Sequence, residues 1–248
     1  MTATPAWPPK SAPRLFVEVT LSPGMMFEID GQQAHYLSRV MRIKPGDAVI
    51  LCDDRTGEWA ARVTDAGKRS VNVELADHLR PRESVPQLTL CAALLKKPRF
   101  DLVLEKATEL GVARIHPVIT RRCVADALNM ERARQIVTEA AEQCARTALP
   151  VIESPVSLDA MLKDWNGSTL FFADETRDAP PAAQCFAQNP PPAALLIGPE
   201  GGFDDAERAA VRAHPAARPL SLGPRILRGE TAAIAAMALW MGVAGDWA

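Results

Sequence analysis

Short apolar runs separated by turn-forming residues fill the first third of the chain. Each run is five or six residues long and rich in strand-favouring side chains, which is typical of a small β-barrel. The runs are LFVEV at 15–19, MMFEI at 25–29, AVILC at 48–52, WAARV at 59–63 and SVNVEL at 70–75. Asp53, Asp54 and Gly57 predict a hairpin turn between the third and fourth runs, and 32–42 predicts one short helix.

The pattern changes near residue 88 to apolar runs that alternate with helical segments. LTLCAALL at 88–95 predicts a buried strand, and the apolar spacing over 100–107 predicts a helix after it. IHPVI at 115–119 predicts the next strand, followed by a helix whose apolar stripe runs over 133–144. This alternation is typical of a mostly parallel sheet that helices cover on both faces.

Three further predicted strands each run into a loop of unusual composition. They are TLFFA at 169–173, AALLI at 193–197 and PLSL at 219–222. Ligands of open parallel sheets bind beyond the carboxyl ends of the strands, so we expect a site at these three loops. The proline-rich segment 179–194 predicts a surface loop or a mobile segment.

Length and composition fit a division into two globular domains. Of the 248 residues, 48% are hydrophobic and 23% are charged, which excludes the disordered and fibrous classes. We expect a flexible leader at 1–13, a small β-barrel domain at 14–80, a linker at 81–87 and an α/β domain at 88–248. No apolar run approaches the roughly 20 residues that span a bilayer, and the first residues lack the apolar core of a secretory signal. We therefore expect a cytoplasmic protein that makes no membrane contact.

Charge is distributed unevenly, although the net charge is only −2. Residues 86–149 contain ten Lys and Arg against seven Asp and Glu, whereas 150–248 contain seven against twelve. The basic segment can form a phosphate-binding face or simply carry solvated charges. Its candidates for phosphate contact are Lys96, Lys97, Arg99, Arg121 and Arg122.

The spacing of cysteine and histidine indicates neither a metal site nor a disulfide framework. The five cysteines are odd in number and form no CxxC pair, and the four histidines show no HxH or HxxxH spacing. We therefore expect reduced cysteines in the core and no bound metal.

The first candidate motif follows the strand predicted at 193–197 and is IGPEGGF, from Ile197 to Phe203. Its three glycines tolerate positive φ and let backbone N–H groups approach a ligand closely. Asp204 and Glu207 have the spacing of a capping box, which predicts that the next helix begins here. The motif is neither GxxxxGKS/T nor GxGxxG, so it matches no ATP or dinucleotide loop, and a plain strand-to-helix connection remains open.

The second candidate motif, SLGPRILRGETAA at 221–233, lies where the last predicted strand ends. Gly223 and Pro224 predict a turn, and the residues after it open an alanine-rich helix. Arg225 and Arg228 flank two apolar residues within this motif. Taken alone, the pattern leaves both arginines open as surface charges or as ligand contacts.

These two motifs, GPEGG and LGPRILRGETA, resemble the SPOUT methyltransferases that modify N3 of a uridine in small-subunit (16S) ribosomal RNA. The resemblance covers nearly the whole chain. It continues through RLF at 14–16, HYLSRVMRIKPGD at 35–47, EKATELGVARIHPV at 105–118, TRRC at 120–123 and AAEQCART at 140–147.

The sequence departs from the family's pattern at two places. Gly229 replaces an expected threonine or similar residue, which predicts a looser turn, and KKPRFD at 96–101 carries a proline where many relatives have an open polar segment.

The resemblance implies an α/β fold with a trefoil-knotted, parallel-sheet methyltransferase domain, preceded by a small PUA-like β-barrel RNA-binding domain. Nothing in periodicity or spacing indicates a knot, because chain topologies are almost always unknotted. The resemblance also implies S-adenosylmethionine as cofactor, 16S ribosomal RNA on the assembled small subunit as substrate, and a homodimer. The last predicted helix, at 231–243, is apolar nearly all round, which fits burial in a core or in a subunit interface.

Candidate roles for single residues follow from the same resemblance. The cofactor-binding candidates are Ile197, Gly198, Glu200, Gly201, Gly202, Leu222, Gly223, Ile226 and Leu227. The candidates for RNA contact, each of which can equally be a solvated charge, are Arg14, Arg39, Arg42, Lys44, Arg121 and Arg122. The catalytic candidates are Arg225, Arg228 and Glu230.

An arginine suits the expected chemistry, because uridine N3 becomes a good nucleophile only after it loses its proton. Negative charge then spreads to the flanking carbonyl oxygens, where a guanidinium from Arg225 or Arg228 stabilises it. Glu200 and Glu230 are candidate proton acceptors, but each lies near the start of a helix, whose positive end stabilises a carboxylate. We therefore expect them to be structural partners of arginines or N–H groups.

Three other functions remain open on the sequence. They are a 2′-O-ribose methyltransferase on the same fold, a non-catalytic RNA-binding protein, and a phosphate-binding α/β enzyme that uses the glycine-rich loop. Their products and ligands distinguish them: ribose methylation, RNA binding without cofactor, or nucleotide binding without S-adenosylmethionine.

Overall fold

Two compact units make up the protein in the computed structural model, which describes residues 7–165, 168–174, 176 and 178–248. The first unit comprises the residues up to Ser84 together with Ala141–Ala148, and the second comprises Val85–Ala140 and Leu149–Ala248. Part of the leader predicted at 1–13 lies outside the described residues. A short segment that the sequence analysis places in the α/β domain, Ala141–Ala148, thus packs with the first unit.

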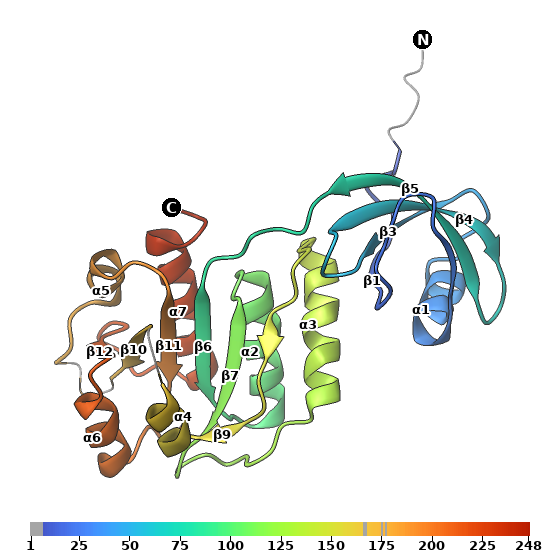
Figure 1. Ribbon diagram of the computed structural model, residues 1–248. Coiled ribbons are helices and arrows are strands. Elements are labelled where there is room, and N and C mark those ends of the chain that lie inside the picture. The colour runs from blue at the N-terminus through green and yellow to red at the C-terminus, as the bar shows by residue number, and fades with distance from the viewer. Residues whose placement is uncertain (1–6, 166–167, 175, 177) are drawn as a thin grey trace. The chain divides into compact units, whose positions relative to one another are not determined.

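The first unit is built on a five-stranded sheet (Figure 1). Its strands are β1 (Arg14–Phe16), β2 (Met26–Ile29), β3 (Ala48–Cys52), β4 (Glu58–Ala66) and β5 (Val71–Arg80), in the order β1-β3-β4-β5-β2. β1 pairs with β3 in parallel, and the other pairs are antiparallel. Four of the five predicted runs are strands over most of their length, whereas the run at 15–19 is a strand only at its first two residues. β4 and β5 extend further than predicted because they pair with each other over nearly their whole length.

The core of the first unit follows the two-residue period of its strands. Val49 and Leu51 of β3, and Val71 and Val73 of β5, are fully buried in one cluster, as expected when alternate side chains face the same side. The predicted β3–β4 turn is also confirmed and depends on Gly57. This residue has a φ of +104°, and a Cβ atom there would collide with the backbone that follows β5.

A helical segment lies between β2 and β3. It begins as α1 (Gly31–His35) and continues as a π-helix, η1 (Tyr36–Val40). Arg42 then takes a positive φ of 54°. The short helix predicted at 32–42 is therefore confirmed over 32–40. Its second half is π-helical, which could not be predicted because apolar spacing does not separate α-helical from π-helical hydrogen bonding.

The second unit contains one sheet in which every pair of strands is parallel. Its strands are β6 (Leu88–Ala93), β7 (Arg114–Ile119), β8 (Val151–Ile152), β9 (Val156–Ser157), β10 (Thr169–Ala173), β11 (Ala193–Ile197) and β12 (Ala217–Leu220). They run in the order β12-β10-β11-β6-β7-β8, and β9 pairs with β7 beside β8. The carboxyl ends of β10, β11 and β12 therefore lie next to one another, although the strands are far apart in sequence (Figure 1).

Helices cover both faces of this sheet, as predicted. They are α2 (Lys97–Glu109), α3 (Met130–Cys144), α4 (Leu158–Asp164), α5 (Ala182–Gln188), α6 (Asp205–Ala213) and α7 (Gly229–Ala244). Phe171 of β10 packs on the side of α2, α3, α5 and α7, whereas its neighbours Leu170 and Phe172 pack on the side of α4 and α6. Both faces are apolar, which explains why these strands appear as continuous apolar runs in the sequence.

The surface loop predicted at 179–194 is wrong over its middle, where α5 forms between two proline-containing turns. Ala182, Cys185 and Phe186 have helical spacing and are buried, and the Phe186 ring meets Phe171 edge-on with centroids 4.9 Å apart. The prolines flank the helix instead of interrupting it, so proline content alone is misleading here.

The expectation that all five cysteines are core residues is wrong for Cys144, which is exposed at the end of α3. Cys52, Cys91 and Cys185 are buried, and Cys123 is half-buried. Burial, reinforced by the nearby Glu58 carboxylate, raises the pKa of the Cys52 thiol to about 12. The buried thiols are therefore protonated at neutral pH and are poor nucleophiles.

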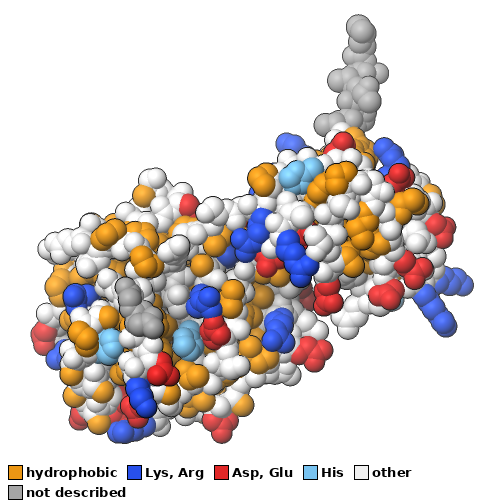
Figure 2. All heavy atoms as spheres, in the orientation of Figure 1, with side chains coloured by type: hydrophobic (Ala, Val, Ile, Leu, Met, Phe, Trp, Pro, Cys, Tyr) orange, Lys and Arg blue, Asp and Glu red, His pale blue; other side chains and the backbone are white. Residues whose placement is uncertain are grey.

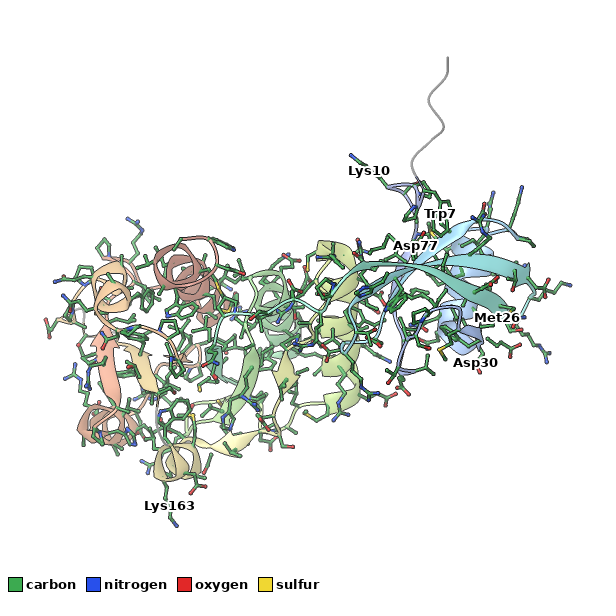
Figure 3. All side chains as sticks on the ribbon, turned by 45° about the horizontal axis from the view of Figure 1, so that its top comes forward. Trp7, Lys10, Met26, Asp30, Asp77 and Lys163 are labelled. Carbon is green, nitrogen blue, oxygen red and sulfur yellow. The ribbon has the colours of Figure 1, made fainter. Side chains whose placement is uncertain are left out.

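Charges of both signs are interspersed over the visible face of the second unit (Figure 2). Figure 3 shows Lys10 and Lys163 projecting away from the body of their own units. Both side chains are exposed and therefore carry solvated charge.

Candidate functional site

A cavity of about 100 Å³ opens where β10, β11 and β12 end. Its lining comes from the loops after these strands and from the start of α7: Ala173, Asp174, Ile197, Gly198, Pro199, Glu200, Gly202, Leu220, Ser221, Leu222, Gly223, Arg225, Ile226, Leu227, Gly229 and Ala232. The structure thus brings together the two sequence motifs at the edge where a site was expected. Of the nine cofactor-binding candidates, only Gly201 lies outside the lining.

The loop after β11 is shaped by its glycines and by the start of α6. A Cβ atom on Gly198 would lie 2.8 Å from a ring carbon of Phe203, so only a glycine fits against this ring. Gly202 takes a φ of +66°, a conformation that glycine adopts at little cost. Asp204 and Glu207 form the predicted capping box, with both reciprocal hydrogen bonds present. The backbone of this loop therefore approaches the cavity closely and is fixed at its far end.

Two arginines from the loop after β7 hold the glycine-rich loop in place. Arg122 Nη1 donates to the carbonyl oxygens of Gly201 at 2.9 Å and Phe203 at 3.3 Å. Arg121 Nη1 pairs with Asp204 Oδ2 at 2.9 Å, and its side chain is 59% exposed. Both arginines were predicted to contact RNA. The structure gives them contacts within the protein, and RNA contact stays a prediction.

The loop after β12 carries the second motif. Gly223 has a φ of +107°, and its N–H donates to the Ser221 hydroxyl at 3.3 Å. Ile226 is 78% exposed although it lines the cavity, whereas Leu227 is half-buried. An exposed apolar side chain at the mouth of a cavity is available to cover a ligand.

Asp174, directly after β10, is a cavity residue that the sequence analysis missed. Its fully buried side chain accepts hydrogen bonds from Arg212 Nε at 2.8 Å and Nη2 at 2.5 Å. Burial raises the pKa of this carboxyl. Hydrogen bonds from the Thr176 N–H and from Arg212 outweigh burial and hold the pKa below its usual value. An acidic residue at the carboxyl end of a buried strand is the signal that could have identified it.

The structure places the three catalytic candidates differently. Arg225 is exposed and lines the cavity, whereas Arg228 is the N-cap of α7 and lies outside the lining. Neither guanidinium makes a hydrogen bond or ion pair within the part of the chain that the structure describes. Glu230, in the first turn of α7, has a side chain that is only 13% exposed. Two unpaired cationic groups and one mostly buried carboxylate therefore lie within six residues.

Arg99 of α2 links two carboxylates that belong to different motifs. Its guanidinium pairs with Glu200, and its Nε lies 3.7 Å from Glu230 Oε1. Both glutamates are thus partners of an arginine, as expected, although that arginine comes from neither motif. Glu200 is 101 positions from Arg99 along the chain, so no local pattern could have indicated this contact.

The basic candidates of the first unit fall into two groups. Arg14 pairs with the buried Glu58, Nε to Oε1 at 2.7 Å, and Arg80 pairs with the same carboxylate at 2.6 Å. Burial raises the pKa of Glu58, but hydrogen bonds from Arg80 and Arg14 hold it below its usual value. The remaining candidates, Arg39, Arg42 and Lys44, are exposed. Arg14 is therefore held by an ion pair within the unit, the other three side chains are exposed, and RNA contact by all four stays a prediction.

Within the described ranges, no group of three His, Cys, Asp or Glu side chains is arranged to hold a metal ion. Burial, with Arg114 nearby, lowers the pKa of His116 on β7, so this half-buried imidazole is neutral at pH 7. None of the helices described is both long enough and apolar enough to cross a membrane.

Comparison with known proteins matches both units to RNA-modifying families. Residues 81–241 match the RNA methyltransferase domain family, and residues 29–76 match the RNA methyltransferase PUA domain family. The ribosomal RNA small subunit methyltransferase E of Rickettsia conorii is 31% identical over 227 residues, which cover 91% of this chain and 93% of the relative. The protein of the same name from Synechocystis is 32% identical over 234 residues, covering 92% and 74%.

A solved structure is similar over the whole chain. It is the ribosomal RNA small subunit methyltransferase E of Neisseria gonorrhoeae bound to S-adenosyl methionine, with a TM-score of 0.86 and 28% identity. The similarity covers 96% of this chain and 100% of that one, so both units and the order of their elements are shared.

Proposed function

This chain belongs to the ribosomal RNA small subunit methyltransferase E family, and on that premise we propose that it methylates small-subunit ribosomal RNA with S-adenosylmethionine. The proposed acceptor is N3 of one uridine in 16S ribosomal RNA, on the assembled small subunit in the cytoplasm. The observation that carries the proposal is the placement of Arg225, which lines the same cavity as the glycine-rich loop and has no hydrogen-bond or ion-pair partner among the described residues.

The residues around the cavity fit S-adenosylmethionine. Ile197, Leu222 and Leu227 offer apolar walls to an adenine ring. At Gly223 a Cβ atom would meet nothing within 4 Å, so the backbone there is accessible to a ligand. The carboxylate of Glu200 suits the cationic part of the cofactor. The bound cofactor supplies a methyl group on a positively charged sulfur, and the protein needs to supply binding, alignment and exclusion of water.

Arg225 is proposed to make uridine N3 a nucleophile. Loss of the N3 proton leaves negative charge on the two flanking carbonyl oxygens, and a guanidinium beside them stabilises that charge through charge-assisted hydrogen bonds. Arg225 is better placed for this role than Arg228, because only Arg225 lines the cavity. An arginine with no ion-pair partner among the described residues keeps all its donors for the substrate.

Exposed basic residues of each unit are proposed to contact RNA. The exposed Arg39, Arg42 and Lys44 of the first unit and Arg121 of the second can contact phosphates, which position an RNA without reading its bases. These contacts explain how one uridine can be selected by the shape of the RNA around it.

A homodimer is proposed as the active assembly. The apolar side of α7 is largely accounted for by packing inside the second unit, where Met237, Trp240 and Met241 are fully buried. Leu239 of α7 and Leu102 of α2 are 42% and 36% exposed, and these two helices pack against each other. The exposed leucines on these two helices are the feature that supports a partner subunit.

Methyl transfer from isotopically labelled S-adenosylmethionine tests the proposal. Naked 16S RNA, isolated small subunits and whole ribosomes are compared as substrates, and we expect the small subunit to be labelled fastest. Calorimetry in the presence of a chelator should show unchanged cofactor binding. RNA binding without cofactor binding would instead support a non-catalytic RNA-binding protein.

A further inference from the structure

One side chain, that of Arg99, connects three segments that the proposed reaction needs in a fixed arrangement. Arg99 lies in the first turn of α2, Glu200 in the loop after β11, and Glu230 in the first turn of α7. The guanidinium pairs with Glu200, and its Nε lies 3.7 Å from Glu230 Oε1. The three side chains are 33%, 23% and 13% exposed, so the ion pairs are partly shielded from water and stronger than surface pairs.

Glu200 lies in the loop proposed to hold the methyl donor, and Glu230 lies in the segment proposed to hold the methyl acceptor. Glu200 lines the cavity beside the glycine-rich loop, where the cofactor is proposed to bind. Glu230 follows Arg228 in the same segment as Arg225, which is proposed to face the uridine. Arg99 therefore links the loop that holds the methyl donor to the segment that holds the acceptor. Without it, the two carboxylates would lose the shared cation that offsets their repulsion.

Glu230 also keeps one oxygen available. Its Oε2 is buried and has no hydrogen-bond partner within the described residues, whereas Oε1 faces Arg99. Buried carboxylate oxygens in proteins normally have a hydrogen-bond donor. The arrangement leaves Oε2 for a donor that arrives with the ligands.

We propose that Arg99 is a positioning residue for methyl transfer. By holding Glu200 and Glu230 together, it aligns the glycine-rich loop with the first turn of α7, and it keeps Glu230 Oε2 directed at an N–H or O–H donor of the bound substrates. Arg99 lies outside the cavity lining and acts only through the two glutamates. This inference rests on the proposed function and assigns a role to a residue that neither sequence motif contains.

Arg99→Gln should lower kcat on the small-subunit substrate on the order of ten- to a hundredfold, the range expected when reacting groups are misaligned by about 1 Å. The Kd for S-adenosylmethionine, measured by calorimetry, should change little. Arg99→Lys should recover part of kcat, because lysine keeps the charge but not the planar fork that contacts two carboxylates.

A double-mutant cycle with Glu230→Gln separates positioning from a general structural role. If Arg99 acts through Glu230, Arg99→Gln should have little further effect on kcat in the Glu230→Gln background. Equal losses in both backgrounds would overturn the inference, as would an unchanged kcat in Arg99→Gln. If Arg99→Gln does not fold, as judged by thermal unfolding, Arg99→Lys provides the same cycle.

Arg132→Gln is the matched control. Arg132 also pairs with a carboxylate of α2, Asp101, at 2.7 Å, but it pairs with neither Glu200 nor Glu230. Its loss should leave kcat at the wild-type value, and a loss equal to that of Arg99→Gln would overturn the inference. A wild-type protein that transfers no methyl group to RNA would contradict the proposed function itself, whereas an active wild type with an equally active Arg99→Gln would contradict only the role of Arg99.

Discussion

Gly229 packs directly against Leu95. A Cβ atom added at Gly229 would lie 2.9 Å from Leu95 Cδ2 and 3.3 Å from the carbonyl oxygen of Gly198. Gly229 is the first residue of α7 and lines the cavity, so this helix begins in close contact with the segment that follows β6 and with the glycine-rich loop. The loosening of this turn by Gly229 stays a prediction, whereas the contact shows that a larger residue has no room here unless Leu95 moves.

Gly229→Ala should destabilise the protein by about 1–3 kcal/mol, the usual cost of adding a methyl group to a filled core. It should also weaken S-adenosylmethionine binding, because the cavity wall must shift. Urea unfolding and calorimetry measure the two effects. Gly242→Ala is the control: it lies in the same helix, but its Cβ would meet nothing within 4 Å. That change should be neutral or stabilise by up to about 1 kcal/mol. Equal destabilisation by both variants would show that the Leu95 contact is unimportant.

Stability in acid should depend on Asp174. Its carboxyl has a pKa below the usual 3.8, so the ionised form stabilises the folded state. That contribution is complete above about pH 4 and is lost as the pH falls through the lowered folded-state pKa. Asp174→Asn should lower the free energy of unfolding at pH 7 by roughly 1–3 kcal/mol and flatten its decline below about pH 4. A variant that declines as steeply as the wild type would contradict this role. Asp126→Asn, at an exposed position, serves as control.

Arg225→Ala should depress turnover far more than cofactor affinity. Removing one charge-stabilising donor costs roughly 3 kcal/mol, which corresponds to a rate on the order of a hundredfold lower. Arg228→Ala should have a smaller effect, because Arg228 lies outside the cavity lining. Single-turnover rates on the small subunit, with calorimetry for cofactor binding, distinguish the two. Full turnover in both variants would indicate that these arginines are surface charges with no role in the reaction.

Much of the fold could be predicted because local patterns determine it. β10 and β11 coincide with the predicted runs 169–173 and 193–197. A short apolar run bounded by turn residues has the length of a buried strand and is too short for a typical helix. The fold class, a PUA-like domain before a parallel-sheet methyltransferase domain, is confirmed by the matched families and by the similar solved structure. The π-helical form of η1 was not predicted, because periodicity does not encode the hydrogen-bond offset. α5 was missed, because proline content does not show on which side of a helix the prolines fall.

The candidate site could be predicted only where its residues are contiguous in sequence. Both motif loops were identified, but the side chains that hold them were not. Arg99 meets Glu200 across 101 positions and Arg212 meets Asp174 across 38, so each pair depends on strand order. The trefoil knot and the roles of single residues stay predictions.

The protein should sediment as a dimer of its 26.8 kDa chain at micromolar concentration. Leu239→Glu should shift the protein toward monomer, because the substitution places a charge at an exposed apolar position of α7. Met26→Glu is the control, since Met26 is 64% exposed but belongs to the first unit. A wild type that sediments only at the mass of one chain would remove the support for a dimer.

The identity of the methylated atom tests the central claim most directly. Small subunits that lack the modification are incubated with labelled S-adenosylmethionine and the protein. The RNA is then digested to nucleosides, which are separated by liquid chromatography and identified by their retention times and fragment masses against methylated standards. Arg225 beside the cavity predicts that the label appears in 3-methyluridine, and that Arg225→Ala reduces this product. Label in a 2′-O-methylated nucleoside, or in a base other than uracil, would contradict the account.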